Sequence, residues 1–286
     1  MILSLNNISK SYGKGKKALD DFSMEFSPGV YGLLGPNGAG KSTLMNIITD
    51  NIRPDFGDTV YDGKSIRSMG EEYRNILGYM PQQQKLYDNF TGEEFLWYMA
   101  ALKGIDKTEK RETIKKLLET VNLSEAATKR IGAYSGGMKQ RILIAQAMLN
   151  DPEILIMDEP TAGLDPSERI RIRNYLSTIS EHKIVIIATH LVSDIEFIAK
   201  EVILLRDGRI IKSESPHKLI NDMIGKVYEI EMAIDEEYNY NNAKIANISM
   251  SLNGKIYRII TDEKISAPNL KPVTPTLEDV YLYYLE

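Results

Sequence analysis

The sequence predicts an α/β fold built around a parallel β-sheet, and two observations carry this prediction. Four short apolar runs lack the alternation of polar and apolar residues, as expected for strands that helices cover on both faces. These runs span residues 30–34, 154–157, 184–188 and 202–205. Segments with helical spacing of apolar residues separate them, which gives the order of strand and helix that is typical of layered α/β proteins.

One long segment, from about residue 88 to residue 150, does not follow this order. It contains helical patterns, such as the one over residues 108–121, and no convincing strand. We therefore expect it to form a helical subdomain inserted into the α/β core. The α/β pattern resumes at Glu153, and we expect the core as a whole to span residues 1–215.

The last part of the chain, residues 216–286, changes character again. Residues 227–232 and 255–261 alternate between polar and apolar side chains, as half-exposed strands do. Thr276 and Asp279 have the spacing of a capping pair, which predicts the start of a helix. The apolar side chains that follow at helical spacing are those of Leu277, Val280, Tyr281 and Tyr284. We expect this part to form a small C-terminal α+β domain.

Composition and charge limit the classes of function. The 286 residues carry a net charge of −5 and no block or stripe of Lys and Arg, which argues against a nucleic-acid-binding protein. The absence of cysteine excludes disulfides and thiolate metal sites. No run reaches the roughly 18 consecutive apolar residues that would cross a membrane, and the N-terminal residues lack the pattern of a signal peptide. We therefore expect a cytosolic chain that reaches a membrane only through a partner.

A glycine-rich loop follows the first apolar run. Residues 35–42 read Gly-Pro-Asn-Gly-Ala-Gly-Lys-Ser, which matches the phosphate-binding pattern G-x-x-x-x-G-K-[ST]. Its glycines let backbone N–H groups and the start of the next helix point at a phosphate. We expect Lys41 to reach the β- and γ-phosphates of a nucleotide and Ser42 to offer its hydroxyl to Mg²⁺. The residues expected to contact the nucleotide here are Gly35, Asn37, Gly38, Ala39, Gly40, Lys41, Ser42 and Thr43.

Two adjacent carboxylates, Asp158 and Glu159, end the second apolar run. In enzymes with this phosphate-binding loop, an aspartate at such a place holds Mg²⁺. A neighbouring glutamate can orient and deprotonate the attacking water, which contributes roughly 10²–10⁴-fold in rate. Charged residues are also common where a strand surfaces, and the phosphate-binding loop argues against that simpler explanation. We expect Asp158 to be a metal ligand and Glu159 to be the general base.

A second anion-binding element is predicted at Ser135, Gly136 and Gly137. These residues precede Met138, Ile142 and Ala145, which recur at helical spacing. A helix that begins with two glycines presents free N–H groups and the positive end of its dipole to an anion. Taken alone, the segment could also be a serine-capped helix with a flexible start. Together with the loop at residues 35–42, it gives one chain two phosphate-binding elements.

In combination these motifs resemble the ATP-binding subunits of ABC transporters. The Ser-Gly-Gly segment resembles the middle of the family's signature sequence, Leu-Ser-Gly-Gly-Gln. The other family motifs follow in order: Tyr12 matches the aromatic residue that stacks on adenine, Gln82 the glutamine loop, Asp165 the loop after the catalytic carboxylates, and His190 the switch histidine. The resemblance covers about residues 1–215 and implies a P-loop NTPase core of the RecA-like type.

The resemblance also assigns roles to these residues. It implies that Gln82 binds Mg²⁺ and takes part in catalysis, that His190 contacts the γ-phosphate, and that Asp165 belongs to the nucleotide site. Gln83 and Gln84 compete with Gln82 for the glutamine position, which the preceding Tyr-Met-Pro sequence assigns to Gln82. Tyr12 has the alternative of being an ordinary surface tyrosine, although an aromatic face suits a base.

The signature segment departs from the family pattern at two positions. Tyr134 stands where the family usually has leucine, and Met138 where it usually has glutamine. Both flank the Ser-Gly-Gly residues that contact phosphate, so we expect hydrolysis to survive. The departures put the fine contacts across a dimer in doubt.

The function implied by the resemblance involves ATP, Mg²⁺ and two kinds of partner. ATP would lie between the phosphate-binding loop of one chain and the Ser-Gly-Gly segment of a second ATP-binding subunit, identical or not. The helical subdomain would pass the motion to a separate integral membrane permease, on the cytoplasmic face of the cell membrane. The sequence Pro-Thr-Leu-Glu-Asp-Val-Tyr over residues 275–281 resembles drug, bacteriocin and lantibiotic exporters of the bacitracin type, which implies export.

Two alternative functions, and two alternative roles for the C-terminal helix, remain at the level of the sequence. A soluble ABC-type ATPase that acts on ribosomes or DNA usually has two ATPase cores or long coiled coils, and this chain has one core and an acidic balance. A P-loop kinase or GTPase leaves the Ser-Gly-Gly segment unexplained. The C-terminal helix could dock on its own domain, or it could stabilise the dimer or the permease contact.

Overall fold

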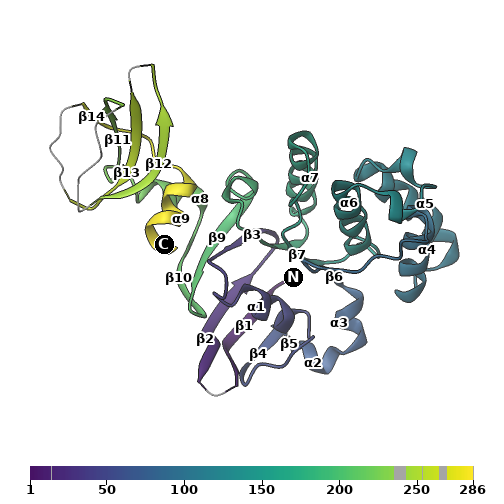
Figure 1. The fold of residues 1–286 in the computed structure, drawn as a ribbon. Coiled ribbons are helices and arrows are strands. Elements are labelled where there is room, and N and C mark those ends of the chain that lie inside the picture. The colour runs from purple at the N-terminus through teal and green to yellow at the C-terminus, as the bar shows by residue number, and fades with distance from the viewer. Residues whose placement is uncertain (14, 235–242, 253, 264–268, 286) are drawn as a thin grey trace.

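The computed structural model describes residues 1–13, 15–234, 243–252, 254–263 and 269–285 (Figure 1). Its centre is a six-stranded sheet with the order β10-β9-β3-β8-β7-β6. The strands are β3 (Gly29–Leu34), β6 (Leu77–Met80), β7 (Ile154–Asp158), β8 (Ile184–Ala188), β9 (Ala199–Arg206) and β10 (Arg209–Glu214). Neighbouring strands from β9 to β6 are parallel, which confirms the predicted α/β class.

The four apolar runs form β3, β7, β8 and most of β9, and every residue of β7 and β8 is buried. Strand β10 differs because it pairs antiparallel with β9. The turn between them passes through Asp207 and Gly208, which have φ angles of 49° and 77°. A turn this tight returns the chain beside the strand it has just left, so β10 cannot run parallel to β9.

The two faces of the central sheet pack against different elements, because successive strand residues point to opposite sides. On one face lie α1 (Lys41–Ile48) and a second, antiparallel sheet with the order β2-β1-β4-β5. That sheet consists of β1 (Leu3–Tyr12), β2 (Lys16–Phe26), β4 (Phe56–Tyr61) and β5 (Lys64–Ser65). On the other face lie α6, α7 and the C-terminal helix. The sequence analysis did not predict the antiparallel sheet.

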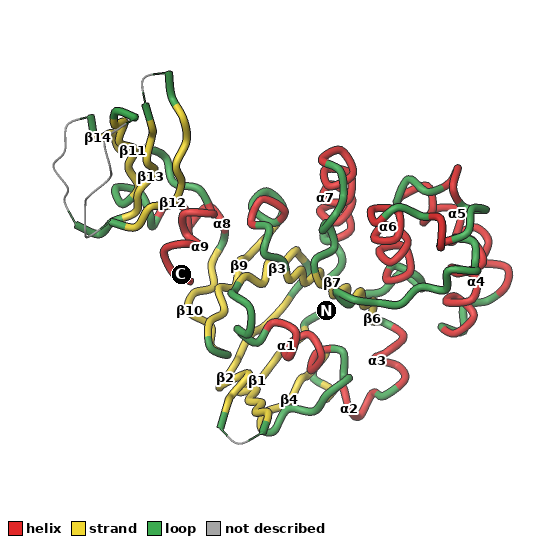
Figure 2. Tube along the Cα trace, in the orientation of Figure 1, coloured by secondary structure: helices red, strands yellow, loops and turns green. Residues whose placement is uncertain are grey.

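The segment between β6 and β7 is helical, and Figure 2 shows it at the right of the molecule. Its helices are α4 (Gly92–Leu102), α5 (Lys107–Thr120) and α6 (Gly136–Ala147), with short 3₁₀ turns at Ser124–Ala126 and Ile131–Ala133. The remaining helices between β5 and β9 are α2 (Ile66–Met69), α3 (Glu71–Asn75), α7 (Pro166–Ile179) and the 3₁₀ turn η3 (Val192–Asp194).

The C-terminal part holds an antiparallel sheet of its own, with the order β12-β13-β11-β14. Its elements are α8 (Pro216–Asn221), β11 (Val227–Met232), β12 (Lys244–Met250), β13 (Lys255–Ile260), β14 (Leu270–Pro272) and α9 (Leu277–Leu285). The final helix begins at the predicted pair, where the Thr276 N–H donates to Asp279 Oδ2 at 2.7 Å. None of the described helices is long and apolar enough to cross a membrane.

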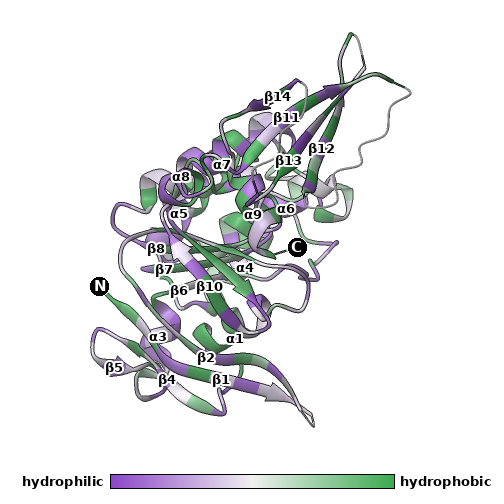
Figure 3. Ribbon diagram, turned by 90° about the vertical axis from the view of Figure 1, so that its left-hand side faces the viewer, coloured by the Kyte–Doolittle hydropathy of each residue, from purple (hydrophilic) through white to green (hydrophobic). Residues whose placement is uncertain are grey.

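Helix α9 lies between the C-terminal sheet and the central sheet, in Figure 1 and again in the turned view of Figure 3. It packs against α8, β9 and η3. Its buried residues Leu277, Val280 and Leu285 join the same apolar cluster as Val202 and Leu204 of β9. The helix therefore docks both on α8 of the C-terminal part and on the core of its own chain. The first contact agrees with the alternative of docking on its own domain, and the second was not predicted.

Candidate nucleotide site

The loop between β3 and α1 has a backbone that requires glycine. Gly38 and Gly40 have φ angles of 82° and 111°, in the left-handed region that L side chains rarely adopt. A Cβ on Gly40 would lie 2.3 Å from the Ala18 carbonyl oxygen, and one on Gly35 would lie 2.3 Å from that of Leu205. The loop can therefore curl closely enough for its N–H groups, and those of the first turn of α1, to surround a phosphate.

The Lys41 side chain lies along this loop. Its Nζ donates to the carbonyl oxygens of Gly35 and Pro36, the latter at 3.1 Å. Burial lowers the pKa of Lys41, while the nearby carboxylates of Glu159 and Asp158 oppose that shift. Two neutral carbonyl acceptors thus hold the ammonium beside the loop. Phosphate oxygens could take the place of these acceptors, and their hydrogen bonds to the ammonium would be stronger because both groups are charged.

A cavity of about 820 Å³ opens over the loop. Every residue predicted for nucleotide, metal or catalysis lines it, except Ser135, Gly136, Gly137 and Asp165. Three further residues also line it: Ala18, Pro36 and, from α9, Tyr281. The volume is of the size that a nucleotide-like ligand needs.

The residues that line the cavity include the predicted Tyr12 and Gln82. Tyr12 ends β1, and its side chain is exposed, at 53%. Gln82 follows β6 and is also exposed, whereas Gln84 donates from Nε2 to Gln146 Oε1 on α6 at 2.7 Å. Of the three consecutive glutamines, Gln82 is the one that lines the cavity.

Asp158 and Glu159 occupy the carboxyl end of β7, where both are buried, at 8% exposed each. The pKa of Asp158 is raised to about 6, mainly by burial and also by the neighbouring Glu159, while Lys41 opposes the shift. A carboxylate in such a position is destabilised as an anion until a cation comes close. The site therefore favours a positively charged ligand at Asp158.

The Glu159 carboxylate is held by the segment that follows β8. Its Oε1 accepts from the His190 backbone N–H at 2.9 Å and lies 2.7 Å from His190 Nδ1, and its Oε2 accepts from the Thr189 hydroxyl at 3.0 Å. Glu159 has a left-handed φ of 52°, and its carbonyl accepts from Gln140 Nε2 at 2.7 Å. Backbone strain of this kind persists only where surrounding contacts fix it.

Thr189 and Gln140 were missed by the sequence analysis. Thr189 directly precedes the predicted site residue His190 and is fully buried. Its position next to His190 in the sequence is the signal that could have identified it. Gln140 lies one turn into the helix that Ser135 caps, and no local pattern marks it. Only the packing of α6 beside β7 shows that it reaches Glu159.

The Ser-Gly-Gly segment lies outside the cavity. Ser135 caps α6 by accepting from the Met138 N–H at 3.2 Å, and Gly136 begins the helix. A Cβ on Gly137 would lie 3.2 Å from the Gly163 carbonyl oxygen. Asp165 is exposed at the start of α7, without a side-chain capping bond. Within one chain, the structure does not bring these four predicted residues together with the phosphate-binding loop.

The two unusual residues of this segment have ordinary packing roles. Tyr134 is buried, and its hydroxyl donates to the Ala126 carbonyl at 2.7 Å. A Cβ on Gly92 would lie 2.2 Å from that hydroxyl, so the ring fills the space which this glycine leaves. Met138 packs partly buried against the same apolar cluster. Tyr134 therefore points into the helical segment, and the start of α6 remains uncovered by it.

Comparison with known proteins agrees with this geometry. The sequence model of the ABC transporter family matches residues 19–162. An ABC transporter ATP-binding protein of Bacillus subtilis, YxlF, is 37% identical over 212 residues, which cover 73% of this chain and 69% of that protein. The Nod factor export ATP-binding protein I of Rhizobium etli is 36% identical over 231 residues, covering 80% of this chain and 73% of that protein.

Solved structures resemble the same region. The bacterial ABC transporter cassette MJ0796, solved as a dimer, superposes with a TM-score of 0.69 at 27% identity, covering 75% of this chain and 98% of that chain. A dimeric post-hydrolysis state of that cassette, bound to ADP and Pi, gives a TM-score of 0.68. The chain belongs to the ATP-binding proteins of the ABC transporter family and is an ATPase.

Proposed function

We propose that this chain is the ATP-hydrolysing subunit of an ABC exporter, which pairs with a second ATP-binding subunit and energises a separate integral membrane permease. One observation carries the proposal. A single cavity contains the phosphate-binding loop, both carboxylates and His190, while the start of α6 lies outside it. The chain thus holds a nearly complete hydrolytic site together with an anion-binding surface that has no phosphate partner in the same chain.

ATP fits the residues of the cavity. The loop supplies N–H donors and Lys41 supplies a positive charge for the phosphates, while the exposed ring of Tyr12 offers a flat apolar face to adenine. We assign the nucleotide to Tyr12, to Gly35, to residues 37–43 and, from a second subunit, to Ser135, Gly136, Gly137 and Asp165.

Mg²⁺ also fits. Asp158 offers a buried carboxylate with a raised pKa, and a nearby cation would lower that pKa again. Ser42 and Gln82 line the same cavity and have neutral side-chain oxygens. The described residues contain no cluster of three or more His, Cys, Asp or Glu that would hold a metal alone. Phosphate oxygens would complete such a site, as is usual for this ion. When bound, Mg²⁺ neutralises charge on the phosphates.

We assign water activation to Glu159. Its Oε1 already touches His190, so a water near the γ-phosphate would find a carboxylate and an imidazole side by side. Glu159 takes the proton of the water, and His190 contacts the γ-phosphate as it leaves. Thr189 donates to the Glu159 carboxylate and Gln140 to its backbone carbonyl, and these two hydrogen bonds hold the residue in place.

A head-to-tail pair of subunits would complete the site. The uncovered start of α6 presents N–H groups and a positive helix end, which the γ-phosphate of ATP bound to the other subunit would satisfy. Hydrolysis removes that shared negative charge and weakens the closed pair, which makes the pairing a ligand-driven population shift. The dimeric state of the MJ0796 cassette supports the pairing of two subunits.

The Nod factor export relatives support export as the direction of transport. A drug, peptide or bacteriocin-like molecule is the substrate class that we propose, on the resemblance of residues 275–281 to such exporters. The permease would hold the subunit on the cytoplasmic face of the membrane. We also propose residues 1–215 as the ATP-binding domain, with the helical subdomain at about 88–150, and residues 216–286 as the accessory domain.

Copurification tests the permease directly. Tagged Glu159→Gln protein, loaded with ATP, is purified from detergent-solubilised membranes, and mass spectrometry identifies what accompanies it. We expect a stoichiometric protein with several membrane spans, whose identity would narrow the substrate. Recovery of ribosomes, DNA or only soluble protein would instead favour the alternative of an ATPase that acts away from membranes.

The second subunit can be tested with Ser135→Glu. Because Ser135 lies outside the cavity, this variant should bind ATP as the parent does. A carboxylate beside the γ-phosphate of the facing subunit is a like-charge contact, so the ATP-dependent dimer should weaken by about tenfold or more. Light scattering of Glu159→Gln protein with and without this change measures the effect.

Ser124→Glu is the matched control, since it adds the same charge at an exposed serine of the helical segment. It should leave ATP-dependent dimerisation as it is in the parent. Unchanged dimerisation of the Ser135→Glu protein would mean that the start of α6 does not face the nucleotide of a second subunit.

A further inference from the structure

The nucleotide cavity has one wall that the phosphate-binding core does not supply. Tyr281, on the C-terminal helix α9, lines it together with the phosphate-binding loop, Tyr12 and His190. The side chain is partly buried and also packs against the apolar cluster of the central sheet. A residue of the C-terminal part thus reaches the site at which the ATP-binding part would hold its ligand.

Two contacts fix α9 beside the elements that form the cavity. At its start, the Leu277 N–H donates to Glu196 Oε1 at 3.5 Å, just after η3, the turn that follows His190. At its end, Arg206 donates from its guanidinium to the Tyr284 carbonyl at 3.4 Å. Arg206 ends β9, and Gly208 in the next turn donates its N–H to the Ala39 carbonyl of the phosphate-binding loop at 2.9 Å.

Helix α9 therefore spans from the switch histidine segment to the turn behind the phosphate-binding loop. A third link joins η3 to the loop after the catalytic carboxylates, since the Thr161 hydroxyl donates to the buried Asp194 carboxylate. One of these segments follows His190 and the other follows Glu159, and both of these residues line the cavity. Tyr281 stands in the middle of the helix that bridges them.

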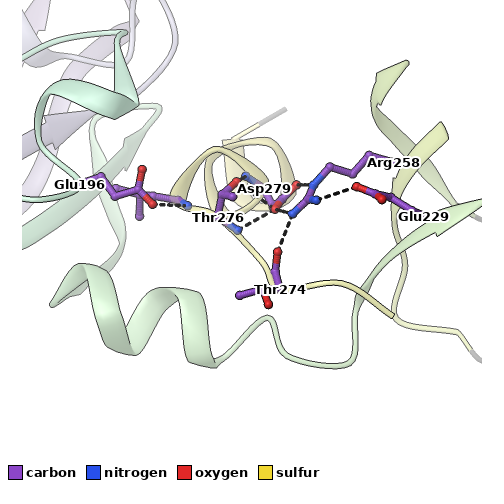
Figure 4. A network of polar contacts seen from close by, with 7 residues as sticks. Glu196, Glu229, Arg258, Thr274, Thr276 and Asp279 are labelled. Atoms are coloured by element: carbon purple, nitrogen blue, oxygen red, sulfur yellow. Dashed lines mark hydrogen bonds and ion pairs between the residues drawn. The ribbon is translucent and has the colours of Figure 1, made fainter. Parts of the chain in front are cut away.

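The other side of α9 is bound firmly to the C-terminal sheet (Figure 4). Asp279 is 2% exposed and accepts from the Arg258 guanidinium at two positions, 3.0 Å and 2.7 Å. The same guanidinium donates to Glu229 on β11 at 3.1 Å and to the Thr274 carbonyl at 2.7 Å. Bidentate pairing of this kind fixes orientation as well as distance, so α9 is held in a defined position on strands β11 and β13.

We propose that Tyr281 is a nucleotide-binding residue, and that α9 thereby couples the C-terminal sheet to the presence of an adenine nucleotide in the cavity. This inference rests on the proposed function and deepens it. An aromatic ring with a hydroxyl provides a stacking face and a hydrogen-bonding group in one side chain. Coupling is reciprocal. If nucleotide changes the affinity of the C-terminal sheet for a partner, that partner would change the affinity for nucleotide by the same factor.

Nucleotide affinity tests the contact. In full-length Glu159→Gln protein, where turnover does not interfere, the dissociation constant for ATP with Mg²⁺ is measured by calorimetry. We expect Tyr281→Ala to raise it about tenfold, which is the range for loss of one aromatic contact with a base. Tyr281→Phe keeps the ring and should stay closer to the parent than Tyr281→Ala does.

Tyr283→Ala is the matched control, because Tyr283 lies on the same helix but contacts Lys226 and Asp262 away from the cavity. Its dissociation constant should equal that of the parent. An equal loss in both alanine variants would overturn the inference, since it would reflect a weakened helix. Parent-like binding by Tyr281→Ala would overturn it alone, whereas failure of the parent to bind ATP would overturn the proposed function as well.

Hydrogen exchange tests the coupling. Addition of ATP to Glu159→Gln protein should slow amide exchange in α9 and β13 as well as in the phosphate-binding loop. In Tyr281→Ala at saturating ATP, the protection of the loop should remain, and that of α9 and β13 should be lost. Exchange in residues 277–285 that does not respond to ATP in the parent would overturn the coupling.

Discussion

Replacing Glu159 with glutamine is expected to lower ATP turnover by roughly 10²–10⁴-fold, the range that general-base catalysis contributes. Glutamine keeps the shape of the side chain, so an oxygen can still accept from the His190 N–H and an amide can still meet the Thr189 hydroxyl. What is lost is the ability to take a proton from water. The left-handed backbone at this position is unchanged, because Gln140 still holds the carbonyl of residue 159.

Phosphate release by the purified chain measures this effect, and ATP binding measured in parallel should be unchanged. Glu214→Gln is a suitable control, because Glu214 is a carboxylate of β10 that pairs with Lys218 at the surface and does not line the cavity. It should hydrolyse ATP at the parent rate. Full turnover by Glu159→Gln would show that another group activates the water.

The sequence predicts those parts of the site whose functional residues are neighbours in the chain. The phosphate-binding loop needs glycines at fixed places because Gly38 and Gly40 adopt left-handed angles, and a pattern search finds that requirement directly. The same holds for the carboxylates of β7, since an apolar run that ends in two charges marks a strand end. Continuous burial makes strands β3, β7 and β8 recognisable for the same reason.

Features that depend on contacts between distant segments of the chain could not be predicted from the sequence. Strand β1 pairs with β4, which lies beyond the phosphate-binding loop in the sequence. The face of β1 towards solvent is polar, so no continuous apolar run marks this strand in the sequence. Gln140 reaches Glu159 only because α6 packs beside β7. Tyr281 followed the helical spacing and was therefore predicted only as one residue of an amphipathic helix.

The C-terminal part is predicted to begin after residue 215. Sequence patterns change there, and the C-terminal sheet has a small apolar cluster of its own around Ile230, Tyr257 and Ile259. Yet Leu277 and Val280 of α9 are buried in the cluster of the central sheet. The division remains a prediction, and the packing of α9 indicates that the two parts share one apolar interior on this side.

Removing the carboxylate of Asp279 is expected to destabilise the C-terminal sheet by about 3 kcal/mol, because Arg258 would keep its charge without its main partner. Burial raises the pKa of Asp279, but the hydrogen bonds from Arg258 and from the Thr276 N–H outweigh it, so that the pKa lies below its ordinary value of 3.8. A carboxyl group with a lowered pKa stabilises the fold above the unfolded pKa, and this contribution is lost as the pH falls below 3.8.

Urea unfolding of Asp279→Ala, monitored by hydrogen exchange in β11 and β13, measures this loss of stability. Asp262→Ala is the matched control, since Asp262 forms an ion pair of 2.8 Å with Lys226 in the same part of the chain but is 59% exposed. Solvent-exposed pairs contribute less than about 1 kcal/mol, so this variant should unfold close to the parent. Equal effects of the two substitutions would mean that Arg258 finds other partners, and that the Asp279 pair does not hold α9 to the sheet.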